Sequence, residues 1–244
     1  MSRTTEYWFE VQEELRENWI RDHLSDEYSE EWDELAQEYD LIHEGLREAA
    51  EFEAEYRWLR EQTYSELHDK FVSEISTLKE LISTSVAFHH EDAFFKMIYA
   101  HAVTLLETFL GDTAISLVIE NPKYFANSIS KVDELKKTKF SLTEISEESD
   151  GAKGLAVKTL STVLYHNIPK AKRILESIIG SSLSVAIDKV GYITSVRHDI
   201  VHRNGKTLDG EKIDIDREIT SQAIEDIESF VRDLQIKINE HGNA

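Results

Sequence analysis

The sequence predicts an all-α protein, and three observations lead to that prediction. Glycine and proline are scarce, with nine and two copies in 244 residues, so long helices with few tight turns are favoured. Apolar residues make up 41% and charged residues 31%, which suits a sizeable core inside a solvated surface. Apolar side chains recur every three or four positions, the period of an amphipathic helix. We expect one helical domain with an additional N-terminal segment.

Residues 1–84 form the predicted N-terminal segment, an acidic amphipathic helical arm. A short helix is expected over residues 4–24, and a longer helix or helical hairpin follows from Trp32 to Ile82, with a weak point near Gly45. Residues 1–60 hold 19 acidic and six basic residues, so most of the net charge of −21 lies here. The aromatic stripe suits a core or an oligomer interface, and the alternative is an arm that docks on protein. Its tryptophans are Trp8, Trp19, Trp32 and Trp58.

Residues 85–244 form the predicted domain, a bundle of about five helices. Residues 89–122 are apolar nearly all round, which predicts a central buried helix. A short helix and a loop are expected over residues 123–150, two helices hinged at Pro169 come next, and another covers residues 182–203. Glu107 lies inside the apolar run. It either needs a buried partner, for which an arginine of a functional site is one candidate, or occupies an exposed position.

Charge and composition exclude several classes of function. A net charge of −21 disfavours broad, nonspecific binding to nucleic acid, because an acidic surface repels phosphates. The absence of cysteine excludes disulfides and thiolate metal sites. No apolar run of 18 residues is found, and the N-terminus lacks the basic and apolar regions of a secretory signal. We therefore expect a cytoplasmic protein with no membrane segment.

The stretch "RHDIVHRNG", residues 197–205, has the most unusual composition in the chain. Ile200 and Val201 are expected to anchor it to the core and leave its polar side chains outside. His198 and His202 are four apart and share a helix face, and Asp199 can pair with Arg203 or support a histidine ring. Three interpretations follow: a basic helix end that complements the helix dipole, a zinc site, or a site for phosphate chemistry. Two histidines are too few ligands for zinc, and no third ligand is evident.

The same stretch resembles the R-x4-6-H signature of the HEPN superfamily, in which arginine is followed by a polar residue, three further residues and histidine. Here these are Arg197, His198 and His202. The context is similar as well, since the motif ends a helix and precedes a short turn and a closing amphipathic helix. The segments "YAHAVTLLETFLGD" and "VLYHNIPKAKRILE" also resemble the family. The resemblance covers roughly residues 85–240 and implies a HEPN-like helical bundle.

The resemblance implies a metal-independent endoribonuclease of a toxin–antitoxin or anti-phage defence system, without a cofactor. His202 would be the catalytic histidine, Arg197 the phosphate-contacting arginine, and His198 the polar residue that orients the site. Asp199, Arg203, Asn204 and Glu107 are the expected supporting residues. The implied substrate is RNA, either single-stranded or in a tRNA loop, cut at a site that a homodimer shares. An antitoxin or another defence-system protein is the implied further partner.

One position departs from the family. In HEPN toxins that a partner nucleotidyltransferase silences, the residue two after the histidine is a tyrosine that receives the modification. This chain has Asn204 there, so a different controller is expected. The alternative function, from another class, is a non-catalytic HEPN-fold module that binds RNA, a nucleotide or a partner protein. The acidic composition favours this alternative, and the Arg197 to His202 spacing favours the enzyme.

Overall fold

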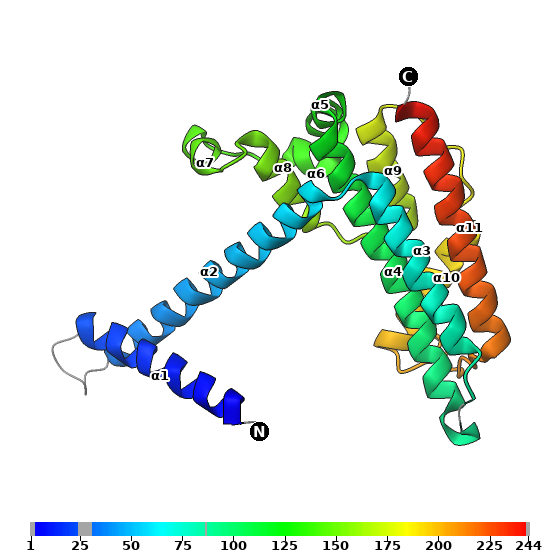
Figure 1. Ribbon diagram of the computed structural model, residues 1–244, viewed down its shortest axis with the longest axis horizontal. Coiled ribbons are helices and arrows are strands. Elements are labelled where there is room, and N and C mark those ends of the chain that lie inside the picture. Colours follow the sequence, from blue (N-terminus) through cyan, green and yellow to red (C-terminus); the bar gives the residue numbers. More distant parts are fainter. Residues whose placement is uncertain (1–2, 24–30, 86, 243–244) are drawn as a thin grey trace. The chain divides into compact units, whose positions relative to one another are not determined.

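The computed structural model describes residues 3–23, 31–85 and 87–242, apart from the side chains of residues 3–10, 31, 88 and 242. It is all-α, as the sequence predicts, and the described residues contain no β-strand. Backbone contacts divide the chain into two compact units, residues 1–57 and residues 58–244. Figure 1 shows the helices coloured along the chain.

The first unit is a pair of helices, α1 (Arg3–His23) and α2 (Glu31–Glu61), the second of which continues into the next unit. Ile20 of α1 is buried, and so is Tyr39 of α2. Trp19 contacts the Tyr39 ring at 5.4 Å between centroids, and Arg16 pairs with Asp40 at 2.8 Å. These contacts hold the two helices together. The side chain of Trp8 lies outside the described residues.

α2 is continuous through Gly45, where the sequence predicted a weak point. The interruption comes instead at residues 62 and 63, where Thr63 caps the next helix. The Thr63 hydroxyl accepts the N–H of Glu66, and the Glu66 carboxylate accepts the N–H of Thr63. This reciprocal pair satisfies two N–H groups that a helix start would otherwise leave without partners.

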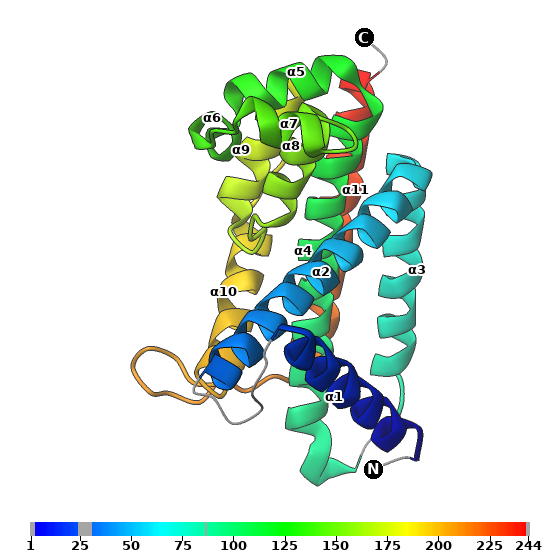
Figure 2. The ribbon, with the colours of Figure 1, turned by 90° about the vertical axis from the view of Figure 1, so that its left-hand side faces the viewer.

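The second unit is a bundle built around one long helix, α4 (Glu91–Glu120), which was predicted as the central helix. Helices α3, α4 and α11 run side by side, and α10 flanks α4 (Figures 1 and 2). The remaining elements of this unit are α3 (Tyr64–Ile82), η1 (Phe88–His90), α5 (Pro122–Lys131), α6 (Asp133–Lys137), α7 (Leu142–Glu147), α8 (Ala152–Ser161), α9 (Ile168–Ile179), α10 (Asp188–His202) and α11 (Arg217–Gly242).

The apolar surface of α4 explains its central place. Half of its thirty residues are buried, among them Phe95, Val103 and Leu110. The helix also corrects one expectation. It contains an 18-residue window with a mean hydropathy of 1.6, long and apolar enough to cross a membrane, where the sequence analysis found no such run. In the structure 61% of that window is buried by protein, which is the environment of a core helix.

The boundary of the bundle lies earlier in the chain than the predicted one between residues 84 and 85. α3 packs along both α4 and α11 and buries Leu67, Phe71, Ile75 and Leu78. Because those side chains fill the space between the three helices, residues 64–82 belong to the bundle rather than to the arm. The contacts of the described residues leave only the part before residue 58 outside it.

Two local predictions about the bundle were wrong. Residues 122–147 form α5, α6 and α7 instead of one short helix and a loop. α10 begins at Asp188 instead of at residue 182. Residues 181–187 are not helical, because Gly180 ends α9 in the left-handed region and the Glu176 carboxylate then takes the N–H of Leu183 at 2.8 Å.

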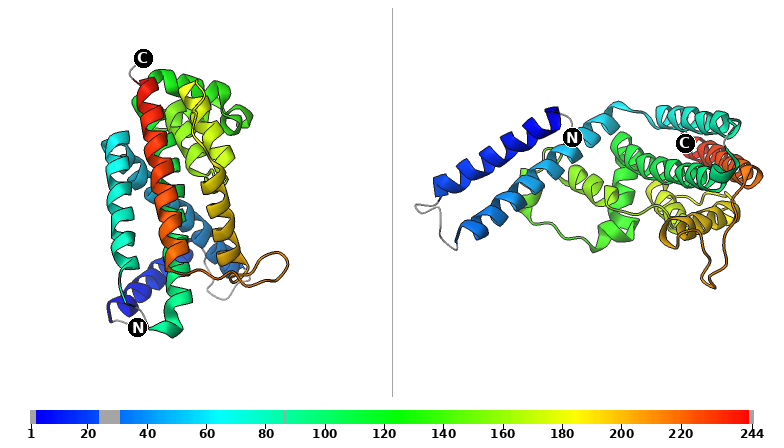
Figure 3. Two further views of the ribbon diagram at one scale, coloured as in Figure 1. Left: turned by 90° about the vertical axis from the view of Figure 1, so that its right-hand side faces the viewer. Right: turned by 90° about the horizontal axis from the view of Figure 1, so that it is seen from below.

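The bundle has two distinct ends. α5, α6 and α9 lie at one end, and the loop between α10 and α11 lies at the other, beside the start of α4 (Figures 2 and 3). This loop contains a single antiparallel bridge between Lys206 and Lys212. The stretch of residues 197–205 therefore lies at the loop end of the bundle.

Candidate functional site

The stretch of residues 197–205 begins within α10, a helix with one buried face and one exposed face. One face is buried against the bundle and consists of Val190, Ile193, Thr194 and Val196. Side chains on the opposite face are exposed, among them those of Ser195, His198 and His202. The sequence prediction that Ile200 and Val201 anchor the stretch was wrong for Val201, which is 50% exposed. The buried stripe ends at Val196, more than a turn before Val201.

Two residues in the left-handed region end α10 and turn the chain. Asn204 has φ of +53° and Gly205 has φ of +73°. The N–H groups of Arg203 and Gly205 both donate to the carbonyl of Asp199, each at 3.1 Å. The carbonyl of Gly205 in turn accepts the N–H of Ile213 at 2.8 Å, which ties the loop back to the helix end. Backbone hydrogen bonds thus fix the helix end at His202, its last residue, and His198 lies one turn earlier.

The two histidines form an exposed pair. Their ring centroids are 4.7 Å apart and the ring planes are tilted by 42°. The four-residue spacing brings them together on one face, as the sequence predicts. Imidazole accepts or donates a proton near neutral pH, so two rings at this spacing can act on the same ligand.

Arg197 turns from α10 towards α4, where it meets Glu107. The guanidinium Nη2 lies 3.6 Å from Glu107 Oε2, and the two side chains are 22% and 20% exposed. That separation exceeds the length of a charge-assisted hydrogen bond, so the two side chains form an ion pair without a hydrogen bond. Arg197 Nε and Glu107 Oε1 are buried and have no hydrogen-bond partner. Glu107 is therefore a partially buried carboxylate beside Arg197. The sequence had left open whether it has an arginine partner or an exposed position.

Asp199 and Arg203 form a third pair within the stretch. Arg203 donates to Asp199, four residues before it on the same helix. The sequence left Asp199 two roles, pairing with Arg203 or supporting a histidine ring. In the structure it pairs with Arg203. The described contacts join Arg197 to Glu107 and His198 to His202, and none of them joins the arginine to either histidine. Among the described residues no third carboxylate or histidine joins His198 and His202 in a metal-binding group.

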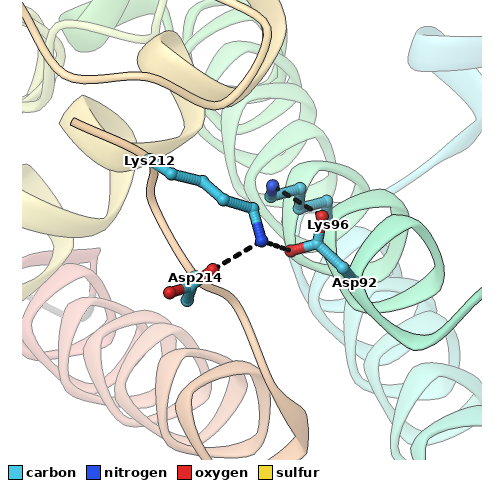
Figure 4. Close-up of polar contacts among 4 residues, drawn as sticks. All are labelled: Asp92, Lys96, Lys212 and Asp214. Atoms are coloured by element: carbon cyan, nitrogen blue, oxygen red, sulfur yellow. Dashed lines mark hydrogen bonds and ion pairs between the residues drawn. The ribbon is translucent and has the colours of Figure 1, made fainter. Parts of the chain in front are cut away.

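A chain of charged side chains attaches the loop after α10 to the start of α4 (Figure 4). Lys96 Nζ donates a hydrogen bond to Asp92 Oδ2 at 3.0 Å. The other carboxylate oxygen, Asp92 Oδ1, lies 3.6 Å from Lys212 Nζ. Lys212 also pairs with Asp214 at 2.6 Å. The hydrogen bond from Lys96 holds the pKa of Asp92 below its ordinary value, and the hydrogen bond to Asp214 raises the pKa of Lys212.

Lys96 is a residue of this site that the sequence analysis missed. Its side chain is 15% exposed and packs against Gly205, where a Cβ atom would lie 2.9 Å from Lys96 Nζ. The spacing of Asp92 and Lys96 indicates only an ordinary ion pair on a helix surface. Its approach to Gly205 depends on how α4 and α10 pack, which no local pattern reports.

A comparison with protein families shows which family the chain belongs to. The family model described as RiboL-PSP-HEPN matches residues 69–240. The chain belongs to the HEPN family. The match begins within α3 and ends within α11, and so contains Glu107 and the whole stretch from Arg197 to Gly205. Membership makes the bundle an RNA-related module. Comparisons with curated proteins and with solved structures give no match.

Proposed function

We propose that this HEPN domain is a metal-independent endoribonuclease. The observation that carries the proposal is the disposition of the motif. His198 and His202 share an exposed face of α10, and Arg197 of the same helix lies 3.6 Å from Glu107 with no hydrogen bond to its guanidinium among the described contacts. A guanidinium offers a planar fork to a phosphodiester, and an imidazole supplies proton transfer. The substrate would be RNA, single-stranded or in a tRNA loop.

The proposed reaction is attack by a ribose 2′-oxygen on the adjacent phosphorus. His202 takes the 2′-OH proton as the new O2′–P bond forms, and the bond from phosphorus to the 5′-oxygen of the next nucleotide breaks. That oxygen leaves with a proton from a second histidine. Arg197 stabilises the charge that develops on the phosphoryl oxygens. The products are a 2′,3′-cyclic phosphate and a 5′-OH, and DNA, which lacks the hydroxyl, is not cut.

A homodimer supplies the second proton-transfer group. His198 is assigned to orienting the site, so one chain offers a single histidine for proton transfer, whereas the reaction uses both an acid and a base. A two-fold axis beside α10 would bring His202 of the partner subunit to the same cleft. The exposure of Ser195, His198 and His202 on one face supports this arrangement, because that face is free of other parts of the bundle.

The absence of cysteine allows a direct test of the dimer. Ser195→Cys introduces a single thiol on the proposed interface, and Ser146→Cys introduces one on α7 as the matched control. A short bifunctional thiol reagent should link two chains of the Ser195→Cys variant and leave the Ser146→Cys variant monomeric on a denaturing gel. Equal linking of both variants, or none of the first, would contradict a two-fold axis at α10.

The biological setting proposed for the enzyme is a toxin–antitoxin or anti-phage system, with an antitoxin or another defence protein as its controller. This rests on the motif type and on family membership. Asn204 stands where nucleotidyltransferase-controlled members have their modified tyrosine, so control through another contact is proposed. The first unit, with Leu41 and Leu46 exposed on α2, offers a surface for a protein partner.

A second candidate function is a binding module without catalysis. The observation in its favour is Glu107, a carboxylate that already lies against the arginine proposed to contact phosphate. A net charge of −21 points the same way. Such a module would bind RNA, a nucleotide or a protein and leave RNA intact.

The experiment that separates the two is incubation of the purified protein with total tRNA and with a defined single-stranded RNA, in EDTA. Wild type should cut RNA, and His202→Ala should bind it without cutting. Binding by wild type without cleavage at any protein concentration would establish the module instead. Circular dichroism of both proteins checks that the substitution leaves the helices intact.

A further inference from the structure

Two segments of this acidic protein carry a concentrated positive charge. Residues 123–139 and 168–182 together contain eight basic and three acidic residues, in a chain whose net charge is −21. These segments form α5, α6 and α9, at the end of the bundle opposite the loop after α10 (Figure 2). We call the following six side chains the basic surface: Lys131, Lys136, Lys137, Lys139, Lys170 and Arg173.

Packing brings the members of the basic surface onto neighbouring elements. α5 packs on both α9 and α6, and the ion pair of Lys170 with Glu134, at 2.8 Å, joins α9 to α6. Lys131 and Arg173 line one open groove of about 390 Å³, together with the serines that follow or end α9. Those serines are Ser177, Ser181 and Ser182. The groove thus combines two cations with three hydroxyl groups.

Five of these six cations form no close ion pair with a described residue, although the charge of Lys137 acts on Glu134. Lys131, Lys136, Lys137, Lys139 and Arg173 are exposed, and none lies within 4.0 Å of a carboxylate in the part of the chain that the structure describes. Elsewhere in the bundle, in contrast, lysines on α3, α4, α10 and α11 are paired with carboxylates. Like charges that gather without partners repel one another, so an anionic ligand would stabilise this surface.

Simpler roles account for single members only. Lys131 lies at the C-terminal end of α9, its Nζ 3.2 Å from a Cβ placed on Gly180, where a cation complements the helix dipole. That role does not extend to the lysines on and after α6. The one carboxylate in the groove, Glu176, accepts hydrogen bonds from the Leu183 N–H at 2.8 Å and the Ser182 hydroxyl at 3.2 Å. Glu176 also lies 3.7 Å from Lys172 Nζ, so its charge already has a partner on α9.

We propose that the basic surface anchors the backbone of an RNA whose scissile bond lies at the distant α10 motif. The inference rests on the ribonuclease function proposed above and adds a second contact region to it. RNA is favoured over a protein partner because protein interfaces are depleted in lysine, whereas phosphates are bound through lysine and arginine clusters. Phe140, 37% exposed directly after Lys139, adds a ring on which a base can stack.

The distance between the two regions sets the length of RNA that both can hold. The groove precedes the start of α10, and the motif ends that helix. α10 has fifteen residues, which correspond to about 22 Å along its axis. An RNA of roughly 16 nucleotides can cover both regions, whereas one of about 4 nucleotides can occupy the motif alone. The basic surface therefore selects for longer RNA and leaves the chemical step on a short RNA unchanged.

The test compares Lys131→Gln/Arg173→Gln with Arg232→Gln/Lys237→Gln, which removes the same charge from α11. Binding is measured with a 2′-O-methyl RNA of roughly 16 nucleotides, which cannot be cut. Cleavage is measured with unmodified RNAs of both lengths. The groove variant should bind the long RNA roughly tenfold more weakly than wild type. The slope of log affinity against log salt concentration should become shallower by about 1.4, because each of two lost phosphate contacts on a single strand contributes about 0.7.

The outcomes separate this inference from the ribonuclease proposal. Weaker binding of the long RNA with unchanged cleavage of the short one supports both. Weaker binding with no cleavage by any protein, wild type included, supports the anchor and overturns the enzyme. Equal binding by the groove variant and the α11 control overturns the anchor, whether or not RNA is cut. Tighter RNA binding by the groove variant also overturns it, because the surface would then hold an acidic protein segment instead.

Discussion

Replacing Gly205 by alanine probes the contact that fixes the end of the motif. Gly205 has φ of +73°, a region that costs a residue with a Cβ roughly 1–2 kcal/mol. The new Cβ would also lie 2.9 Å from Lys96 Nζ, so the ammonium must move from its ion pair with Asp92. Loss of that pair adds up to about 1 kcal/mol. We expect Gly205→Ala to lower the free energy of unfolding by about 1–3 kcal/mol in total.

Gly210 is the matched control, because it has φ of +83° and nothing within 4 Å of its would-be Cβ. Gly210→Ala should therefore show only the backbone cost of about 1–2 kcal/mol. Urea unfolding followed by circular dichroism measures both variants, with the slope checked for constancy. In a Lys96→Ala background the cost of Gly205→Ala should fall to that of Gly210→Ala. Equal costs for the two glycines in the wild-type background would refute the argument for a tight contact with Lys96.

Three further predictions concern the charges around the site and the first unit. Arg197→Ala should abolish cleavage and weaken RNA binding by about 1.5–3 kcal/mol. Glu107→Gln should strengthen RNA binding, because a competing carboxylate charge is removed. Fluorescence anisotropy with uncleavable RNA measures the binding of both variants. Since the pKa of Asp92 is lowered, its ion pairs stabilise the fold fully above the ordinary value of 3.8 and lose effect as the pH falls through the lowered one. The stability advantage of wild type over Asp92→Asn should therefore vanish in acid and persist at neutral pH, and a constant difference across pH would contradict this. Deleting residues 1–57 should weaken dimerisation or increase RNA binding, and a folded truncation unchanged in sedimentation and anisotropy would exclude both roles.

Periodic burial made the broad fold predictable from sequence. α4 is apolar on nearly every side, and a helix of that kind has to lie inside the protein, as it does here. The motif helix, its stop near Asn204 and the pairing of Asp199 with Arg203 follow equally from local spacing. These features depend on residues within one or two helical turns of each other, so the sequence contains the information directly.

Features that depend on packing between distant segments were not predictable. Leu183 and Val185 are buried although they precede α10. Because they are apolar, their spacing in the sequence resembles an extension of that helix. The apolar stripe of α3 resembles that of the preceding helix, so nothing local shows that it joins the bundle. Val201 is apolar yet half exposed, because the buried stripe of α10 ends at Val196. The approach of Lys96 to Gly205 likewise exists only once α4 and α10 are packed.

The most direct test of the ribonuclease proposal is cleavage of an RNA carrying a single 2′-deoxyribose at the mapped cleavage position, in EDTA. Wild type should cut the unmodified RNA and leave a 2′,3′-cyclic phosphate, identified by mass spectrometry. It should bind the modified RNA equally well and fail to cut it at that position, because the attacking hydroxyl is gone. Cleavage of the modified RNA at the same position, or products that end in a 3′-OH, would contradict attack by the 2′-hydroxyl at the Arg197 and His202 site.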